Sequence, residues 1–257
     1  MESGYRSPLI DFFRRGEVAR DVRLMAAEGA LAPRAHEQLA LLIFLSDDAD
    51  PDIAASANAT LDALPVEPLQ AFLARSDVPE QMRGFFSTRG VSAGSQPATD
   101  VAPLVDTGEP TDVPDDTPPD EDGPLVLSSL SIVDRMKLAM KGTKAQRSQL
   151  VRDSNKLVAA AVLSSPKLTE SEVEAFSKMA NVSEETLRTI AMNRTWSKNY
   201  GVIAGLTRNP KTPVSIAMQF VQRLNDKDLK ALATDRNVQE GVRLAARKFS
   251  KGAKKGE

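Results

Sequence analysis

Basic side chains recur along the C-terminal half of the sequence. Arg152 and Lys156 are followed by Arg194 and Lys198, and then by Arg236, so about one such position falls in each period of roughly 40 residues. In a stack of helical repeats, equivalent positions line up along one ridge. A basic ridge attracts phosphates, because each neutralised phosphate releases condensed counterions. This spacing therefore predicts a groove for phosphate groups.

Other basic residues and one tryptophan extend this surface. The candidate ridge consists of Arg152, Lys156, Arg194, Trp196, Lys198, Arg208, Lys211, Arg236, Arg243 and Arg247. The tail residues Lys251, Lys254 and Lys255 have the same sign of charge. Trp196 or Tyr200 would be available to stack on a nucleic-acid base.

A structural interpretation explains the same pattern without a ligand. Asn193–Arg194 and Asp235–Arg236 would form a ladder that cross-links the corners of adjacent repeats, and the other cations would be solvated residues. The lone tryptophan would then be a core residue at helical spacing. The sequence leaves both interpretations open.

Residues for acid–base or redox chemistry are scarce. The sequence has one histidine, His36, and no cysteine, which excludes paired-histidine metal motifs, thiolate sites and a cysteine nucleophile. His36 falls in a helical stretch and is interpreted as a structural or solvated residue. Lys141-Gly142-Thr143 lacks the upstream glycine of a phosphate-binding loop. We therefore expect no catalytic residue and no cofactor.

One acidic cluster resembles the start of a calcium-binding loop. Asp48, Asp50 and Asp52 have the first three spacings of such a loop. However, Ile53 stands where the loop requires glycine, and Ala59 stands where it requires a bidentate glutamate. Acidic residues at the start of a helix explain the cluster better, because the helix dipole favours them there. We therefore expect no metal site.

The charges are unevenly distributed along the chain. Residues 129–257 hold 24 of the 33 basic and 12 of the 35 acidic residues, a balance of +12, whereas residues 1–128 have a balance of −14. The segment 91–128 contains no lysine or arginine, and its acidic residues are interspersed with prolines. Such a composition buries too little apolar surface to offset chain entropy. It predicts a disordered acidic linker between an N-terminal domain, 1–90, and a basic C-terminal domain, 129–250, which is followed by a basic tail, 251–257.

An internal repeat is the strongest indication of fold in the C-terminal half. Leu187–Arg194 matches Leu229–Arg236 in the pattern Leu, basic, any residue, Ile or Leu, Ala, any residue, Asn or Asp, Arg, and Pro166-Lys167 recurs as Pro210-Lys211. The interval of about 40 residues is typical of stacked helix pairs. It predicts that Leu187, Ile190, Leu229 and Leu232 are equivalent buried residues.

Helix-start signals agree with this period. Thr169 and Glu172 form a capping box, Thr212 before Pro213 predicts an N-cap, and Asn237 is expected to cap the last helix. With its repeats and its short amphipathic helices, the sequence resembles the HEAT-like family of α-helical repeats. The resemblance implies two small all-α domains, each a HEAT-like α-solenoid or bundle.

The N-terminal half shows the same features. Asp50-Pro51 predicts the start of an alanine-rich helix. Helices are expected near residues 18–28, 34–45, 51–63, 67–75 and 79–87. The longest apolar runs, 39–45 and 157–163, are far shorter than the roughly 20 residues of a membrane span. With no signal peptide at the start, we expect a cytoplasmic protein.

Three classes of function follow from these observations. The first is a non-catalytic protein-interaction scaffold, since helical repeats offer an extended surface. The alternative is a nucleic-acid-binding protein that uses the basic C-terminal domain, with the acidic linker masking this domain reversibly. The third is an enzyme like the HEAT-like DNA glycosylases, for which the sequence offers no motif residues. The oligomeric state is left open.

Overall fold

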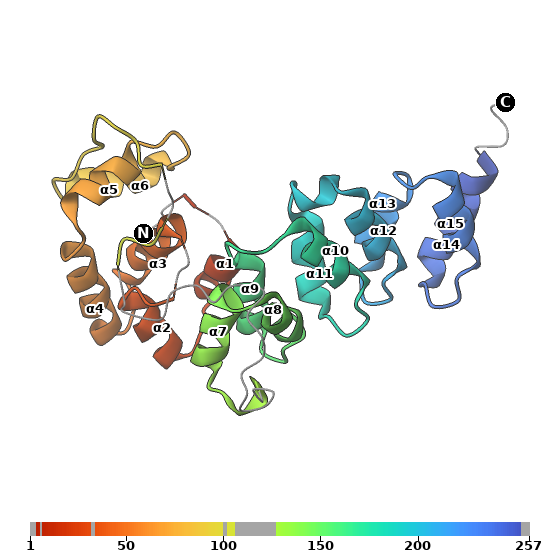
Figure 1. Ribbon diagram of the computed structural model, residues 1–257, viewed down its shortest axis with the longest axis horizontal. Helices are drawn as coiled ribbons and strands as arrows, with labels where there is room; N and C mark the ends of the chain where they lie inside the picture. The colour runs from red at the N-terminus through yellow and green to blue at the C-terminus, as the bar shows by residue number, and fades with distance from the viewer. Residues whose placement is uncertain (1–3, 6, 32–33, 100–101, 106–126, 253–257) are drawn as a thin grey trace. The chain divides into compact units, whose positions relative to one another are not determined.

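The computed structural model describes residues 4–5, 7–31, 34–99, 102–105 and 127–252 (Figure 1). Within these ranges the chain forms helices joined by turns and contains no strand, which confirms the predicted all-α class. The chain divides into two compact units, residues 1–143 with 160–167 and residues 144–159 with 168–257. This division lies further along the chain than the predicted one at 91–128. No helix of the described ranges is long and apolar enough to cross a membrane.

The first unit is built around one buried helix, α3. The elements of this unit are α1 (Pro8–Arg14), α2 (Arg20–Ala27), α3 (Ala35–Leu45), α4 (Pro51–Asp62), α5 (Val66–Leu73), α6 (Glu80–Thr88), the 3-10 turn η1 (Leu127–Ser129) and α7 (Ile132–Lys141). All residues of α3 from Leu39 to Ile43 are buried. A helix that is apolar on every side must be enclosed by others, and α1, α2 and α4 pack against it.

The expected N-terminal helices are confirmed as α2 to α6, with ends that differ by one or two residues. The periodic pattern misses α1, although Ser7 and Pro8 carry a signal for it. The Ser7 side chain accepts a hydrogen bond from the backbone of Ile10, and Pro8 is the first helical residue. Serine followed by proline is a favoured helix start, because proline lacks the N–H that has no partner at this position.

The predicted disorder of 91–128 is wrong for its first part. The backbone N–H of Gly94 donates to Gln70 O at 2.9 Å, and that of Ala98 donates to Ala71 O at 2.8 Å. Further on, Leu104 and Val105 are bound by the side chain of Gln38. Residues 91–99 and 102–105 therefore belong to the first unit. Residues 100–101 and 106–126 of the predicted linker lie outside the described residues.

The second unit consists of short helices, each packed on its near neighbours in the chain. They are α8 (Lys144–Leu150), the start of α9 (Lys156–Ser164), α10 (Glu170–Lys178), α11 (Glu184–Met192), the 3-10 turn η2 (Trp196–Lys198), α12 (Tyr200–Arg208), α13 (Val214–Val221), α14 (Asp226–Thr234) and α15 (Glu240–Gly252). The remainder of α9 belongs to the first unit.

Two glycines let α12 approach α10 closely. A Cβ atom at Gly205 would lie 2.0 Å from Ser177 Oγ, and one at Gly201 would lie 2.2 Å from Glu174 Cδ. At Gly205 the Cβ would also lie 3.0 Å from Ser177 Cβ, so this position favours the absence of a side chain, whereas at Gly201 the flexible end of Glu174 could move aside. The close approach explains why two otherwise unfavourable glycines stand within one helix.

A buried ion pair joins α8 to α10. Arg147 Nε donates to Glu172 Oε1 at 2.9 Å and Arg147 Nη2 donates to Glu172 Oε2 at 3.1 Å, and the two residues are 0% and 2% exposed. Glu172 also accepts hydrogen bonds from the backbone N–H and the hydroxyl of Thr169. The predicted capping box of Thr169 and Glu172 is thereby confirmed.

Two of the predicted caps are wrong. Pro213, and not Thr212, is the N-cap of α13. Thr212 Oγ1 is buried without a hydrogen-bond partner, while its backbone carbonyl accepts from the side chain of Gln239. Asn237 does not cap the last helix, because α15 begins at Glu240 and the Asn237 backbone donates to Asp235. In both cases the corner before the helix is one or more residues longer than the sequence indicates.

Corners of one type recur along the second unit. Asp153, Asn193 and Asp235 each follow a helix and accept a hydrogen bond from the backbone N–H two residues ahead, at 2.7, 2.9 and 2.9 Å. Short Asx side chains suit such turns because they replace a backbone acceptor. The expected burial of Leu187, Ile190, Leu229 and Leu232 is confirmed.

Candidate functional site

The corners decide which basic residues of the candidate ridge are equivalent. Arg194 and Arg236 each directly follow a corner residue, Asn193 or Asp235, and both are exposed. Arg152 instead precedes its corner residue, Asp153, so it is not their counterpart. The position equivalent to Lys198 in the next repeat is Glu240, which has the opposite charge. By this criterion, Arg194 and Arg236 correspond to each other, whereas Arg152 and Lys198 have no basic counterpart.

Four of the predicted ridge residues are bound to neighbouring helices or to their own helix. Lys156 pairs with Glu185 at 3.0 Å, and Arg208 pairs with Asp228. Arg152 Nε donates to the Ser148 carbonyl, and Arg247 Nε donates to the Ala233 carbonyl near the end of α14, each at 3.0 Å. Side chains held in this way are less available to an external phosphate.

The predicted ladder between Asn193–Arg194 and Asp235–Arg236 is absent from the described part of the chain. The side chains of Asn193 and Asp235 accept bonds from their own corners instead. Within that part, the side chains without a hydrogen bond or ion pair include the ridge residues Arg194, Lys198, Lys211, Arg236 and Arg243. These five cations are the part of the ridge that remains free to meet a partner.

The two aromatic residues have different surroundings. Trp196 is half-buried in η2, and its equivalent in the next repeat is the buried Val238. Tyr200 is 41% exposed, but its hydroxyl donates to Asp228 and accepts from the Asn225 backbone at 3.2 Å. The bond from Tyr200 and the nearby Arg208 hold the pKa of Asp228 below its usual range. Tyr200, Arg208 and Asp228 thus form a polar link between α12 and α14.

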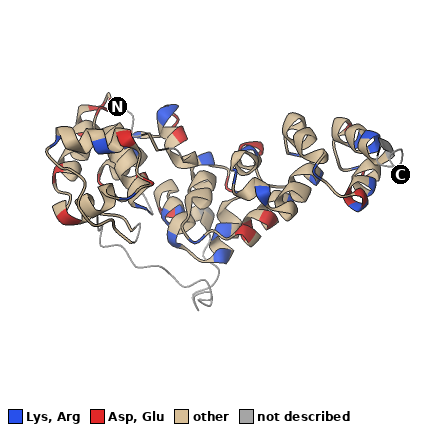
Figure 2. Ribbon diagram, turned by 90° about the horizontal axis from the view of Figure 1, so that it is seen from above, with Lys and Arg blue, Asp and Glu red and all other residues tan. Residues whose placement is uncertain are grey.

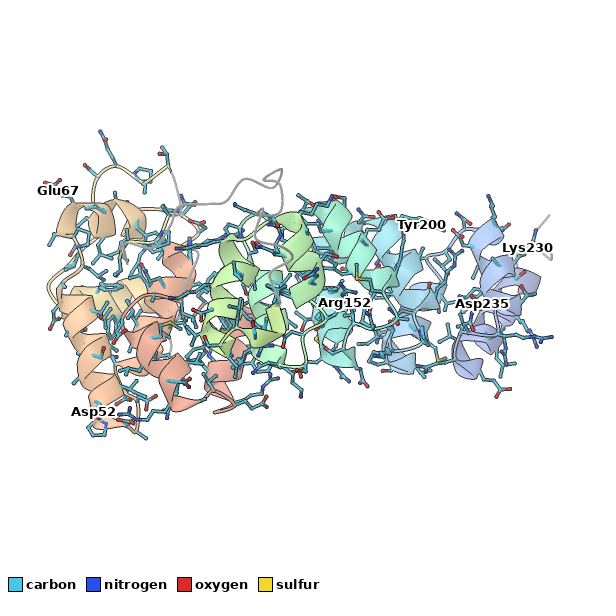
Figure 3. All side chains as sticks on the ribbon, turned by 60° about the horizontal axis from the view of Figure 1, so that its bottom comes forward. Asp52, Glu67, Arg152, Tyr200, Lys230 and Asp235 are labelled. Atoms are coloured by element: carbon cyan, nitrogen blue, oxygen red, sulfur yellow. The ribbon has the colours of Figure 1, made fainter. Side chains whose placement is uncertain are left out.

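The surface charge of the second unit is mixed. Figure 2 shows lysines and arginines next to acidic residues along its helices. Arg152, Tyr200 and Asp235, which come from different parts of this unit, are well separated in Figure 3. A strongly basic groove would need a larger area of one sign.

Exposed apolar side chains accompany the free cations. Met192, the last residue of α11, is 69% exposed, Leu244 of α15 is 53% exposed, and Met218 of α13 is also exposed. The sequence gives a weak signal for Met192: it stands two positions after Ile190, off the face that Leu187 and Ile190 bury. Met192 ends α11, Arg194 lies two residues further on, and Trp196 begins η2. We call these three residues the α11 corner.

His36 occupies a packed position in the first unit. Its ring lies 4.6 Å from the Phe72 ring and 5.4 Å from the Tyr5 ring between centroids, and its Nε2 is 3.7 Å from Asp77 Oδ2. Burial lowers the pKa of His36, and the carboxylate of Asp77 offsets part of this effect. Burial and the nearby Glu37 raise the pKa of Tyr5 to about 12. This environment favours neutral side chains, in keeping with a structural histidine.

The acidic cluster of the first unit is occupied by arginines of α2. Arg23 Nη1 lies 2.6 Å from Asp48 Oδ1, and Arg20 bonds Asp50 and Asp52, each at 2.7 Å. Asp50 is also the N-cap of α4, which confirms its interpretation as a helix-start residue. No group of three or more potential metal ligands is found among the described residues.

In comparisons with known proteins, no family model matches the chain, and neither does any curated protein or any solved structure. Its function has to be inferred from its own residues.

Proposed function

We propose that the chain is a non-catalytic protein-interaction scaffold built from HEAT-like helical repeats. The observation that carries this proposal is the α11 corner, where an exposed methionine, a free arginine and a half-buried tryptophan alternate with other residues between positions 192 and 196 of the sequence. Methionine, arginine and tryptophan are enriched in protein interfaces, and arginine and tryptophan are the commonest energetic anchors there.

The correspondence of corners supports the repeat. Asn193 and Asp235 bring α11 and α14 into register, and the helices on either side then correspond as well, α10 with α13 and α12 with α15. Each proposed repeat therefore contains three helices. Stacked repeats bury their apolar faces against one another and leave their corners for partners.

The partner expected at the α11 corner is a protein with an apolar residue beside an acidic one. Arg194 would pair with the acid while Met192 supplies an adaptable apolar contact. The acidic segment 106–122 lies outside the described residues. Because of its charge, it would compete with such a partner for Arg194.

The test is affinity capture with the immobilised full chain after nuclease treatment of the extract. Arg194→Glu is compared with Lys230→Glu, an equal charge change at an exposed position in the middle of α14. We expect proteins that wild type and Lys230→Glu retain and that Arg194→Glu loses. Identical capture by all three chains would contradict the proposal.

The free cations of the second unit support a second candidate, nucleic-acid binding. Arg194, Lys211 and Arg236 all lie at corners without a side-chain partner in the described ranges. If they bind phosphates, the affinity of the full chain for a labelled single-stranded oligonucleotide should fall steeply with salt. Arg194→Glu should flatten the salt dependence more than Lys230→Glu does. No measurable binding at about 50 mM salt would eliminate this candidate.

A further inference from the structure

A short piece of the first unit, residues 102–105, is held by one buried side chain, and we call it the strap. Gln38 of α3 is 1% exposed. Its Oε1 accepts from the backbone N–H of Leu104 at 2.7 Å and from that of Val105 at 3.0 Å, while its Nε2 donates to Val105 O at 3.4 Å. Two successive N–H groups that converge on one oxygen define a bend, and a bend is found at Leu104 and Val105.

The amide of Gln38 depends on this backbone for its hydrogen bonds. Apart from the strap, its only partner in the described ranges is the Gly29 carbonyl, to which Nε2 donates at 2.9 Å. If the strap left, Oε1 would lose both of its protein donors. An unsatisfied buried polar atom is costly, so the site favours occupation by a peptide backbone of the same shape.

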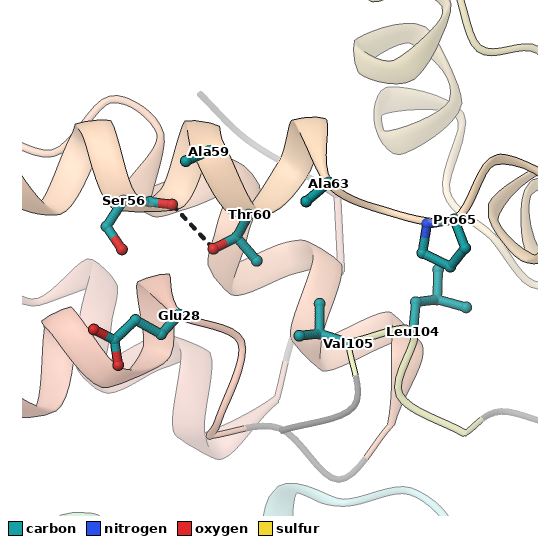
Figure 4. Close-up of a pocket in the computed structure, with 8 residues that line it drawn as sticks. All are labelled: Glu28, Ser56, Ala59, Thr60, Ala63, Pro65, Leu104 and Val105. Atoms are coloured by element: carbon teal, nitrogen blue, oxygen red, sulfur yellow. Dashed lines mark hydrogen bonds between the residues drawn. The ribbon is translucent and has the colours of Figure 1, made fainter. Parts of the chain in front are cut away.

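The groove around the strap is made of small residues. Gly29 has a φ of +82°, and a Cβ atom there would lie 3.0 Å from the Val105 side chain. Ser56, Ala59 and Thr60 of α4 and Ala63, its C-cap, line the opposite wall (Figure 4). With Glu28, Pro65 and the strap residues Leu104 and Val105, they line an open hollow of about 500 Å³. The strap therefore leaves part of its groove unfilled.

The strap is less buried than a core segment, and it is held through its main chain, as a bound peptide is. Leu104 and Val105 are half-buried, and Ala102 and Pro103 are exposed. The Gln38 side chain bonds only main-chain atoms of the strap. The apolar side chains of Leu104 and Val105 line the hollow. Segments with few buried contacts open locally at a small fraction of the global unfolding free energy.

We propose that this groove is a peptide-binding site and that the strap is its intramolecular ligand. Its ligands would be bent peptides in which proline is followed by two apolar residues, as in Pro103-Leu104-Val105. The backbone N–H groups of these two apolar residues must be free to donate to Gln38. An external partner with such a segment would displace the strap. The site belongs to the first unit and is independent of the α11 corner, so either proposal can fail without the other.

The test uses the full chain and a fluorescein-labelled peptide with the sequence of residues 99–108. Val105→Asp places a carboxylate in the groove near Glu28 and should release the strap, leaving Gln38 free. Ala102→Asp is the matched control, because it adds the same charge at an exposed strap position. A tethered segment competes at an effective concentration on the order of millimolar.

Fluorescence anisotropy should show that Val105→Asp binds the peptide at least tenfold more tightly than wild type and Ala102→Asp do. Adding Gln38→Leu to Val105→Asp should abolish this binding. The proposal is overturned if Val105→Asp, with wild-type helix content by circular dichroism, binds no more tightly than wild type.

If Val105→Asp does not fold, hydrogen exchange of the wild-type chain tests whether the strap opens on its own. The amides of Leu104 and Val105 should exchange at least tenfold faster than that of Leu42, which lies in the buried middle of α3. Exchange of the strap amides only at the rate of global unfolding would show that the strap is a fixed part of the fold and would overturn the proposal.

Discussion

The buried pair of Arg147 and Glu172 allows a sharp test of how the second unit is held together. The Glu172 side chain accepts four hydrogen bonds, two from Arg147 and two from Thr169. Glu172→Ala removes all four at once. Glu172→Gln keeps a side chain that can complete the capping box but removes the charge that faces Arg147.

The expected losses follow from these contacts. Removing one partner of a fully buried ion pair costs roughly 3 to 5 kcal/mol, because the remaining charge loses the hydrogen bonds of the pair. Glu172→Ala also removes the capping box, which is worth about 1 kcal/mol. Glu172→Gln should therefore be less destabilising than Glu172→Ala. Replacing both partners by apolar residues of similar size, Arg147→Met with Glu172→Leu, should cost much less than the sum of the single changes.

Tryptophan fluorescence is a suitable assay, because Trp196 is the only tryptophan of the sequence and lies in the second unit. Urea unfolding of wild type, the two single variants and the double variant, followed by this signal, gives a double-mutant cycle for the unit itself. A matched control is Arg188→Met, which breaks the exposed pair with Glu184 and should cost less than about 1 kcal/mol.

The cycle could refute this reasoning in two ways. Single losses below about 1 kcal/mol would mean that Arg147 and Glu172 are solvated in the protein. A double variant as unstable as the sum of both singles would mean that the two residues do not interact.

Three further predictions concern the cores of the two units. Burial raises the pKa of Glu37, and its Oε1 makes no hydrogen bond. The folded protein therefore binds the proton of the Glu37 carboxyl group more tightly than the unfolded chain does, and stability is lost as pH rises above the unfolded pKa. Glu37→Gln should therefore stabilise the chain at pH 7, by roughly 1 to 3 kcal/mol, and weaken this pH dependence in thermal unfolding; an unchanged pH profile would contradict it. Ile190→Ala should cost roughly 2 to 5 kcal/mol by tryptophan-monitored unfolding, and a loss below about 0.5 kcal/mol would show that the residue is not a filled core position. Gly205→Ala should destabilise by about 1 to 3 kcal/mol, whereas Gly84→Ala, with open space around it in α6, should stabilise by up to about 1 kcal/mol; equal effects would show that the close approach of α10 and α12 is unimportant.

Local signals in the sequence were sufficient for the helices and for part of the core. Helical periodicity located α2 to α6, and the match between Leu187–Arg194 and Leu229–Arg236 found residues that are buried in both copies. These predictions succeeded because burial within one helix depends on residues three and four positions apart.

The strap could not be predicted in the same way. Composition indicated disorder from residue 91, because acidic and proline-rich segments lack an apolar period. Its order near Val105 comes from one side chain far away in the sequence, Gln38, together with the space left by Gly29. Long-range contacts of this kind leave no periodic trace in the segment itself.

The candidate ridge shows a related difficulty, because the spacing of basic residues does not by itself give the register of a repeat. Arg152 and Arg194 look equivalent when the repeat is read from the spacing of arginines alone. The Asx corners place them two residues apart in register, with Arg152 before Asp153 and Arg194 after Asn193. A corner fixes the direction of the chain as it leaves a helix, so two residues on opposite sides of a corner point differently whatever their separation in the sequence. Equivalence in a repeat protein is therefore set by hydrogen bonds at the corners, and by this criterion Arg194 and Arg236 are the two arginines that would correspond in the proposed repeats.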